Sequence, residues 1–447
     1  MQNGLRRTMF LLALPVLCEQ FLSFGVGFVD TWLSGRLSAD ATTAVGFGAY
    51  FGWLASMLFA LVGTGTTALV ARHWGAGEFD DANRVMNRSI ALASLMGIVV
   101  YGAIYALAPS FAHFLHLEGE SGAIVTRYLR LDGIGQVFNA VTLAGAAALR
   151  GSGNMRTPMM ILGLVNLLNM LVSAVLVYGF GPLPAIGIDG IVIGTVVARF
   201  AGGIAMLAIL SKGLGSLRLR LSALRIRGNT VRRILKIGSP AAIDGMLTWA
   251  GQFVFLMVIA NLESVGRNSD TFAAHMIGIR VEGITYLPAV AWGMAAATLV
   301  GQSLGANDVK RAVQSGHEAA IQCGILAALI SILFFFLAEP IFMLMHDSES
   351  VRSIGVPAFR LMAIFQVPLI ALIIYEHALH GAGDTKYPML INVTGVFCIR
   401  VSIAYLFGIV WNGGLVGAWI GMFADVTIRA ILMTARFVRG RWIHTKV

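Results

Sequence analysis

Charged side chains are scarce in this chain. Asp, Glu, Lys and Arg make up 12% of its 447 residues, whereas apolar residues make up 57%. A typical soluble domain carries about twice this share of charged residues, so the composition excludes the soluble globular class. Together with a mean hydropathy of +0.80, it places the chain in a lipid bilayer.

Cysteines are few as well, and several catalytic motifs are missing. Cys18, Cys323 and Cys398 lie in apolar stretches, at spacings that predict neither a disulfide framework nor a metal centre, so we expect them to fill the core. The sequence contains no phosphate-binding P-loop, no nucleophile elbow and no pair of catalytic carboxylates. We therefore expect no enzyme, no bound cofactor and no ATP-driven pump.

In place of charge, the sequence has long apolar stretches. A helix of about 20 apolar residues crosses a bilayer, and stretches of this length recur twelve times. The sequence thus predicts an all-α membrane protein with twelve transmembrane helices. The predicted spans are 9–34, 43–70, 89–113, 124–148, 157–179, 188–211, 239–262, 271–300, 316–345, 352–380, 388–411 and 416–436.

Lys and Arg gather in alternate loops between these spans. Cytoplasmic loops of membrane proteins retain such residues, and Arg6, Arg7, Arg72 and Arg150 all fall on the side that also holds the C-terminal tail. We therefore expect both termini in the cytoplasm and the protein in the plasma (inner) membrane. The net charge of +10 is explained by loops that face anionic lipid headgroups, so no nucleic-acid partner is predicted.

Two loop motifs occur twice. The sequence LRGSGNMRTP at 149–158 and the sequence LHGAGDTKYP at 379–388 lie 230 positions apart. The stretch 68–76 matches 298–306 at the same offset. Matches at one offset in separate loops indicate that the chain is an internal duplication.

The duplication divides the chain into two pseudo-symmetric six-helix lobes. We predict an N-terminal lobe at 1–211, a basic cytoplasmic linker at 212–236 and a C-terminal lobe at 237–447. Repeats in a membrane setting are typical of transporters, with the substrate path between the halves. Since no ATP-binding motif is present, an ion gradient would supply the energy.

Asp30 is the first candidate for an ion-coupling residue. It lies near the outer end of the first span, with no Lys or Arg within one helical turn. A charged group in the hydrocarbon region is costly and needs a reason, so an unpaired carboxylate there indicates a proton carrier or a cation ligand. The alternative is an acid at the helix end that the outer loop solvates.

Glu19 and Asp244 occupy equivalent positions in the two halves. Each follows a matched proline, Pro15 or Pro240, by four residues. The helical rise of 1.5 Å per residue puts Glu19 roughly 16 Å from Asp30, too far for the two to share one ion. Glu19 and Asp244 either take part in transport or balance helix dipoles and the basic inner loops.

The second half carries further charges within its predicted spans, which are Arg280, Glu282, Glu376 and Arg400. In one interpretation, Arg280 or Arg400 neutralises Glu282 or Glu376 across helices. In the other, these charges form a second coupling site. Asp425 and Arg429 are four residues apart and are expected to pair. The stretch from Glu376 to His380 resembles a metal-binding helix only in part, because it lacks the full spacing, so no metal site is predicted.

Three uncharged polar residues complete the candidates. Asn169 and Ser173 fall on one side of the fifth span, and Thr195 lies in the sixth. Such side chains line an aqueous cavity, ligate a hard cation or make interhelical hydrogen bonds. The residues alone do not distinguish these roles.

The chain resembles the multidrug and toxic compound extrusion (MATE) family over nearly its whole length. The resemblance rests on Val29-Asp30-Thr31 with Gly35, on Gly75, on the motif at 149–158 and on the repeats of these motifs in the second half. It implies twelve helices in two lobes. It also implies a secondary antiporter, expected to be monomeric, that exports cationic amphipathic drugs or toxic metabolites in exchange for H⁺ or, less favoured, Na⁺.

The resemblance also assigns site residues. It gives Asp30 the place of the family's coupling acid in the first helix, and it matches Asn169 and Thr195 to polar positions of that site. Ser173 stands where archaeal-type members have an acid. Thr248 stands where some sodium-coupled members have a glutamate in the seventh helix, and their aspartate in the tenth helix has no acidic match here. Both departures favour proton coupling, and Glu376 is a candidate substitute.

A flippase for a lipid-linked precursor, found in the wider superfamily, is the alternative function. Such a protein needs a strongly cationic central cavity to hold pyrophosphate. Arg199, Arg280 and Arg400 are the candidates for it. Their convergence on one cavity would favour the flippase.

Overall fold

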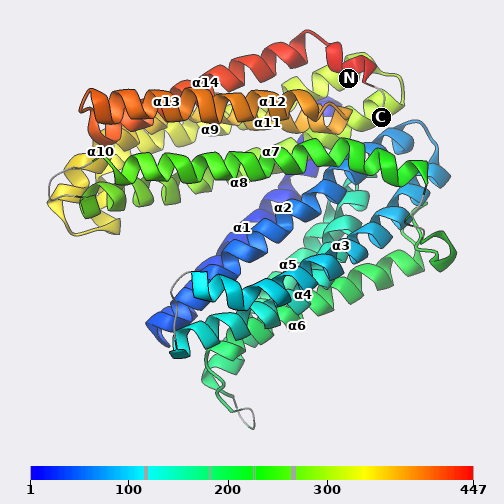
Figure 1. The fold of residues 1–447 in the computed structure, drawn as a ribbon. Coiled ribbons are helices and arrows are strands. Elements are labelled where there is room, and N and C mark those ends of the chain that lie inside the picture. The colour runs from blue at the N-terminus through cyan, green and yellow to red at the C-terminus, as the bar shows by residue number, and fades with distance from the viewer. Residues whose placement is uncertain are drawn as a thin grey trace. The chain divides into compact units, whose positions relative to one another are not determined.

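The structure is a computed structural model that describes residues 2–114, 119–180, 182, 184–224, 226, 228–262 and 268–445. Its named elements are all helices (Figure 1), which confirms the predicted all-α fold class. Backbone groups in a bilayer must find partners within the protein, and a helix provides these partners within its own segment. Arg225 and Arg227 of the predicted linker lie outside the described residues.

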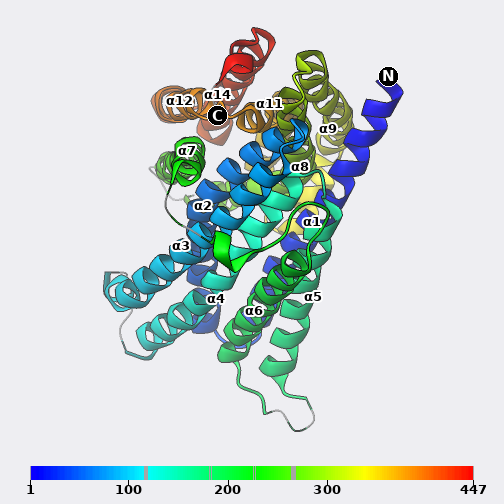
Figure 2. The ribbon, with the colours of Figure 1, turned by 90° about the vertical axis from the view of Figure 1, so that its right-hand side faces the viewer.

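The first half contains six long helices and a short 3-10 turn. Their bounds are α1 Gln2–Gly35, α2 Ala39–Gly75, α3 Phe79–Phe114, α4 Gly119–Gly151, α5 Arg156–Tyr178, α6 Ile188–Lys212 and η1 Leu221–Ala223. In this half α4 packs against α2, α3 and α6 (Figure 2). Helix α4 therefore connects α2, α3 and α6 in this half.

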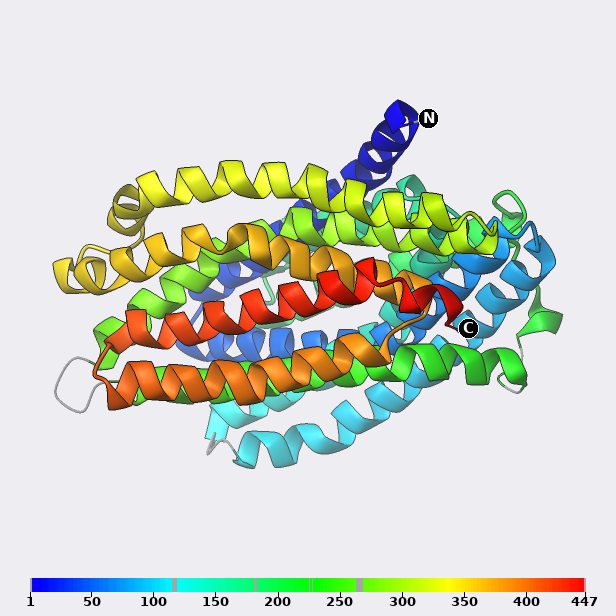
Figure 3. The same cartoon turned by 90° about the horizontal axis from the view of Figure 1, so that it is seen from above.

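The second half repeats this series with one bent span and one span that contains π-helical turns. Its bounds are α7 Asn229–Ala260, α8 Asn268–Gly305, α9 Val309–Met345, α10 Glu349–Ile364, α11 Gln366–Ala382, α12 Lys386–Thr394, η2 Gly395–Arg400, α13 Val401–Ala404, η3 Tyr405–Val410, α14 Gly414–Val438 and η4 Arg441–His444. The run from α12 to η3 lies alongside α14 (Figure 3, orange and red).

Every predicted span coincides with a described helix or helical run. Ten of these are long and apolar enough to cross a membrane, and the pair α10 and α11, bent by 52°, makes an eleventh. The helix α4 is 33 residues long, but polar residues such as Asp132, Gln136 and Asn139 lower its hydropathy. In the structure these three residues are connected by hydrogen bonds.

The chain divides into two compact units. The C unit comprises Met1–Ala13 and Ile243–Lys446, and the N unit comprises Leu14–Ala242. Both α1 and α7 therefore contribute to both units, and each changes unit within three residues of its proline, Pro15 or Pro240. Proline removes a backbone hydrogen bond and weakens the helix at that point.

The predicted linker is attached to α3 within the N unit. The backbone amides of Arg218 and Arg220 donate to the side-chain oxygens of Asn83 and Asn87, each at 2.8 Å. Both asparagines are buried. These bonds satisfy polar groups that would otherwise be costly to bury, so this part of the linker is a packed segment.

The duplication reappears in the hydrogen bonds of the repeated motif. The amide of Asn154 donates to the carbonyl of Leu149 at 2.9 Å, and the amide of Asp384 donates to that of Leu379 at 2.9 Å. Between them, Gly153 and Gly383 adopt φ values of +90° and +86°. Glycine adopts this region without steric cost, so the repeated Gly ends the helix in both halves.

The other glycine of the motif allows two helices to approach closely. A Cβ on Gly151 would lie 3.0 Å from the carbonyl oxygen of Thr67 on α2, and a Cβ on Gly381 would overlap the backbone of Ala297 on α8. Thr67 and Ala297 are themselves 230 positions apart. The same helix crossing is thus built twice.

This crossing predicts a stability effect. We expect Gly381→Ala to destabilise the protein by about 1–3 kcal/mol, because α8 and α11 must separate to admit the methyl group. The matched control is Gly324→Ala in α9, where a Cβ would meet nothing within 4 Å and should stabilise by roughly 0.5–1 kcal/mol. Thermal unfolding of the purified variants in detergent measures both, and equal midpoints would contradict the predicted crossing.

Candidate functional site

Asp30 lies within α1, close to its C-terminal end, in the N unit. Its Oδ1 atom is shielded from solvent and accepts no hydrogen bond from the described residues. The charged groups that act on it are Arg199 of α6 and Asp132 of α4. Buried carboxylate oxygens normally accept hydrogen bonds. This oxygen accepts none from the described residues, so it is free to bind a proton or a cation.

Arg199 is held by another carboxylate. Its Nη1 donates to Oδ1 of Asp132 at 2.8 Å, and Gln136 donates to the second oxygen of Asp132 at 2.9 Å. Gln136 in turn accepts a hydrogen bond from Asn139 at 3.2 Å. Arg199 and Asp132 therefore neutralise each other. Asp30 keeps a negative charge that no hydrogen-bonded cation among the described residues balances.

The sequence analysis missed part of this cluster. Asp132 and Gln136 were not among the predicted site residues, and Arg199 was considered only as a possible phosphate ligand. A signal was present, since Asp132, Gln136 and Asn139 recur at helical spacing and share one face of α4. Their partner, Arg199, is 67 positions away from Asp132, and sequence spacing does not reveal such a contact.

Asn169, Ser173 and Thr195 meet where α5 packs on α6. The Nδ2 of Asn169 donates to Oγ1 of Thr195 at 2.8 Å, and Thr195 and Ser173 both donate to the carbonyl of Ile191, at 3.1 and 3.3 Å. The Oδ1 atom of Asn169 is shielded from solvent without a partner among the described residues. No hydrogen bond recorded for the described residues joins Asp30 to these three. Among its described residues, the N unit thus holds two orphaned acceptors, Oδ1 of Asp30 and Oδ1 of Asn169.

Glu19 is already neutralised. Arg150 of the repeated motif donates through Nη2 to both carboxylate oxygens of Glu19, at 2.6 and 2.7 Å, and both residues are buried. A permanent guanidinium partner balances the charge of this acid. The geometry therefore supports the balancing interpretation of Glu19 over a role in transport.

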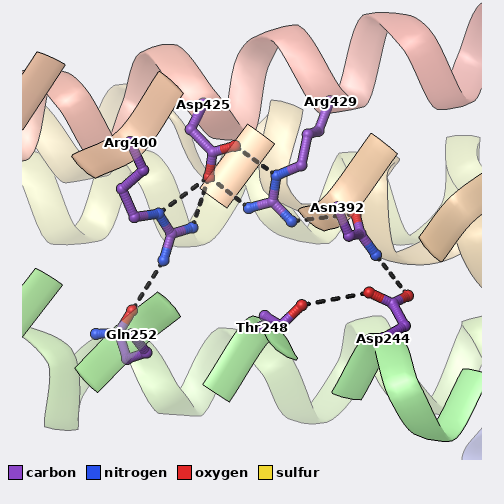
Figure 4. Close-up of polar contacts among 7 residues, drawn as sticks. All are labelled: Asp244, Thr248, Gln252, Asn392, Arg400, Asp425 and Arg429. Atoms are coloured by element: carbon purple, nitrogen blue, oxygen red, sulfur yellow. Dashed lines mark hydrogen bonds and ion pairs between the residues drawn. The ribbon is translucent and has the colours of Figure 1, made fainter. Parts of the chain in front are cut away.

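In the C unit, a chain of polar contacts connects α7 with α12, η2 and α14 (Figure 4). Asp425 accepts from Nε of Arg400 at 3.0 Å and from Nε and Nη2 of Arg429, both at 2.7 Å. Arg400 also donates to Gln252 at 2.8 Å. Asp425 and Arg429 pair as expected, but Arg400 bonds to Asp425 and not to Glu282 or Glu376.

The same chain ends at Asp244. Arg429 donates to Asn392 at 3.2 Å, and Asn392 donates to Oδ2 of Asp244 at 2.8 Å. Thr248 donates to the other oxygen of Asp244 over 3.3 Å. Asp244 is therefore oriented by neutral side chains and, unlike Glu19, has no direct cationic partner among the described residues (Figure 4).

The three arginines considered for a phosphate site do not gather within either unit. Arg199 belongs to the N unit, whereas Arg280 and Arg400 belong to the C unit. Arg199 and Arg400 are bound to carboxylates, and Arg280 is exposed and forms no ion pair with the described residues. Cations already neutralised by acids bind anions weakly, so this arrangement counts against the flippase.

Comparison with known proteins identifies the family. The MatE family model matches residues 15–175 and again 240–406. The two matches begin at the equivalent prolines, which confirms the internal duplication. Together they cover well over half of the chain.

Relatives and solved structures match along almost the whole length. The chain is 28% identical over 442 residues to the probable multidrug resistance protein NorM of Thermotoga maritima, covering 98% of this chain and 93% of that protein. It is 27% identical over 461 residues to the multidrug resistance protein PmpM of Pseudomonas aeruginosa, covering 98% and 94%. The fold matches the outward-facing conformation of a multidrug resistance MATE family transporter of the MOP superfamily, with a TM-score of 0.87, 18% identity and coverage of 97% and 95%. This chain is therefore a member of the MATE family of multi-pass membrane transporters and is not an enzyme.

Proposed function

We propose that this transporter exports cationic amphipathic compounds in exchange for protons, with Asp30 as the proton-binding residue of the N unit. The observation that carries the proposal is the shielded, unpartnered oxygen of Asp30 beside the bonded pair of Asp132 and Arg199. The names of the relatives, which are multidrug resistance proteins, support the class of substrate. The basic residues of the predicted inner loops support cytoplasmic termini in a plasma (inner) membrane.

The polar groups around Asp30 favour H⁺ over Na⁺. A proton needs a single carboxylate oxygen, whereas hard metal cations bind several oxygen ligands at once. In the N unit, the orphaned acceptors of the candidate residues are Oδ1 of Asp30 and Oδ1 of Asn169. No hydrogen bond among the described residues joins Asp30 to Asn169, Ser173 or Thr195, so these contacts do not gather several oxygens around Asp30.

Protonation would act through Arg199. The negative form of Asp30 attracts Arg199, and its negative charge also acts on Tyr128 of α4. Protonation of Asp30 removes this attraction, so Arg199 then interacts with Asp132 alone. A ligand shifts a conformational equilibrium only through such differential interactions, so the proton changes how strongly Asp30 of α1 is attracted to Arg199 of α6. Binding of a cationic substrate and binding of the proton would then favour different conformations.

Transport in proteoliposomes tests the proposal. The purified protein is reconstituted with a fluorescent organic cation, and an inward proton gradient or an inward sodium gradient is imposed separately. We expect export driven by the proton gradient, abolished by a protonophore and absent from protein-free liposomes. Export driven by the sodium gradient alone would replace H⁺ by Na⁺, and no export under either gradient would contradict the antiport.

A further inference from the structure

Asp244, Glu376 and His380 converge inside the C unit. One carboxylate oxygen from each acid and one imidazole nitrogen of His380 all lie within 4.8 Å of one another. Glu376 and His380 are four residues apart on one face of α11, and Asp244 reaches them from α7. The site thus joins two helices that are far apart in the sequence.

Each member of this trio has free ligand capacity. The Nε2 atom of His380 is shielded from solvent and has no hydrogen-bond partner among the described residues. Asp244 is 3% exposed and uses its oxygens on Asn392 and, at longer range, on Thr248. A carboxylate oxygen accepts more than one such bond. Asp244 and Glu376 also repel each other, a cost that a bound cation would remove.

The duplication shows what is missing from this site. Asp244 corresponds to Glu19 at an offset of 225, and His380 corresponds to Arg150 at an offset of 230. In the N unit, Arg150 neutralises Glu19 through two short hydrogen bonds. In the C unit, an imidazole replaces this guanidinium, so the cation that is built into the first repeat is absent from the second.

The second repeat also gains a negative charge. Glu376 corresponds to Ala146 at the offset of 230. At this site the N unit therefore has one acid, Glu19, balanced by one arginine, whereas the equivalent site of the C unit has two acids beside a histidine. The cation Arg429 is connected to Asp244 through Asn392 and is itself bonded to Asp425. Among the described residues, no cation forms an ion pair with Glu376.

We propose that Asp244, Glu376 and His380 bind a divalent transition-metal ion of the Zn²⁺ class. Two carboxylates and one imidazole form a ligand set typical of such ions, with a fourth position for water. The hard ions Na⁺ and Mg²⁺ take oxygen ligands and leave an imidazole unused. The ion replaces the missing arginine and fixes α7 to α11 at the start of the C unit.

His377 does not belong to this site, although it lies beside Glu376 in the sequence. Its Nδ1 lies 2.9 Å from the carbonyl oxygen of Ile373, and its ring packs where a Cβ on Gly293 of α8 would clash. In the stretch from Glu376 to His380, the histidine that lies at the site is therefore His380 and not the adjacent His377. His377 serves as the matched control.

The test measures binding of Co²⁺, a spectroscopic probe for zinc sites, to the purified full-length protein after removal of any affinity tag. His73, Glu78 and Asp81 form a second cluster that offers metal ligands, so all variants carry His73→Ala. We expect one Co²⁺ per chain with visible absorption bands of a low-symmetry site, and a higher unfolding midpoint with Zn²⁺. Glu376→Gln and His380→Gln should each weaken binding at least tenfold, and His377→Gln should leave it unchanged.

A second variant keeps the test decisive if the single changes misfold. Combining Glu376→Ala with His380→Arg copies the residues of the first repeat, so the new arginine should neutralise Asp244 as Arg150 neutralises Glu19. This variant should fold without metal and show no Zn²⁺-dependent rise in its unfolding midpoint. Co²⁺ binding that survives in this variant, or no binding to the His73→Ala protein, would overturn the proposal. Neither result depends on proton coupling at Asp30.

Discussion

Replacing Asp30 by Asn should abolish gradient-driven export and leave the protein folded. Asparagine has the shape of the protonated acid but binds no proton, so the N unit is held permanently in the loaded state. The neighbouring pair of Asp132 and Arg199 keeps its direct bond of 2.8 Å in either state, so folding does not depend on the charge of Asp30. In proteoliposomes, export of the fluorescent cation under an imposed proton gradient should fall to the leak rate of protein-free vesicles.

Asp189→Asn is the matched control for this experiment. Asp189 lies in the first turn of α6 in the same unit, and its carboxylate is paired with Arg127. A paired, partly exposed carboxylate contributes little to stability and has no open valence for a proton. We expect this variant to export at the rate of the unmodified protein. If Asp30→Asn did so as well, another group would have to carry the proton.

The helices and their duplication could be predicted because they depend on local properties. Length and apolarity determine a membrane span, and every predicted span coincides with a described helix or helical run. The repeated loops were recognisable because their backbone requires specific residues, as at Gly153 and Gly383 with their positive φ values. The residues that meet these requirements are close together in the sequence.

The polar partners could be predicted only in part, because they depend on how each helix is rotated about its axis. The pairing of Asp425 with Arg429 follows from a spacing of four residues and was expected. The partner of Arg400 was left open between two glutamates, but the structure gives it to Asp425, which lies on another helix. Hydropathy does not fix which face of a buried helix meets which neighbour.

The asymmetry between the repeats was available in the sequence but was not recognised. Glu19 and Asp244 were treated as equivalent because their positions match. Their environments differ because the partner of the first, Arg150, becomes His380 in the second repeat. The two acids occupy equivalent positions in the sequence, but the residues that contact them differ.

Asp425→Ala should cause the largest loss of stability among the charged residues of the C unit. It removes the acceptor shared by Arg400 and Arg429, whose side chains are 9% and 7% exposed, and leaves two guanidinium groups buried without a carboxylate. Breaking a buried ion pair from one side typically costs about 3–5 kcal/mol. Thermal unfolding in detergent should show a correspondingly lower midpoint.

Two comparisons separate this electrostatic effect from the loss of packing. Asp81→Ala removes the partner of Arg84 in an exposed pair, with side chains 42% and 54% exposed, and should cost about 0–1 kcal/mol. Replacing Asp425, Arg400 and Arg429 together by apolar residues of similar volume should recover most of the stability, because no buried charge is then left unpaired. If the single change were no more harmful than Asp81→Ala, the guanidinium groups would have to reach water or lipid headgroups. The chain of hydrogen bonds from Gln252 to Asp244 would then contribute little to holding these helices together.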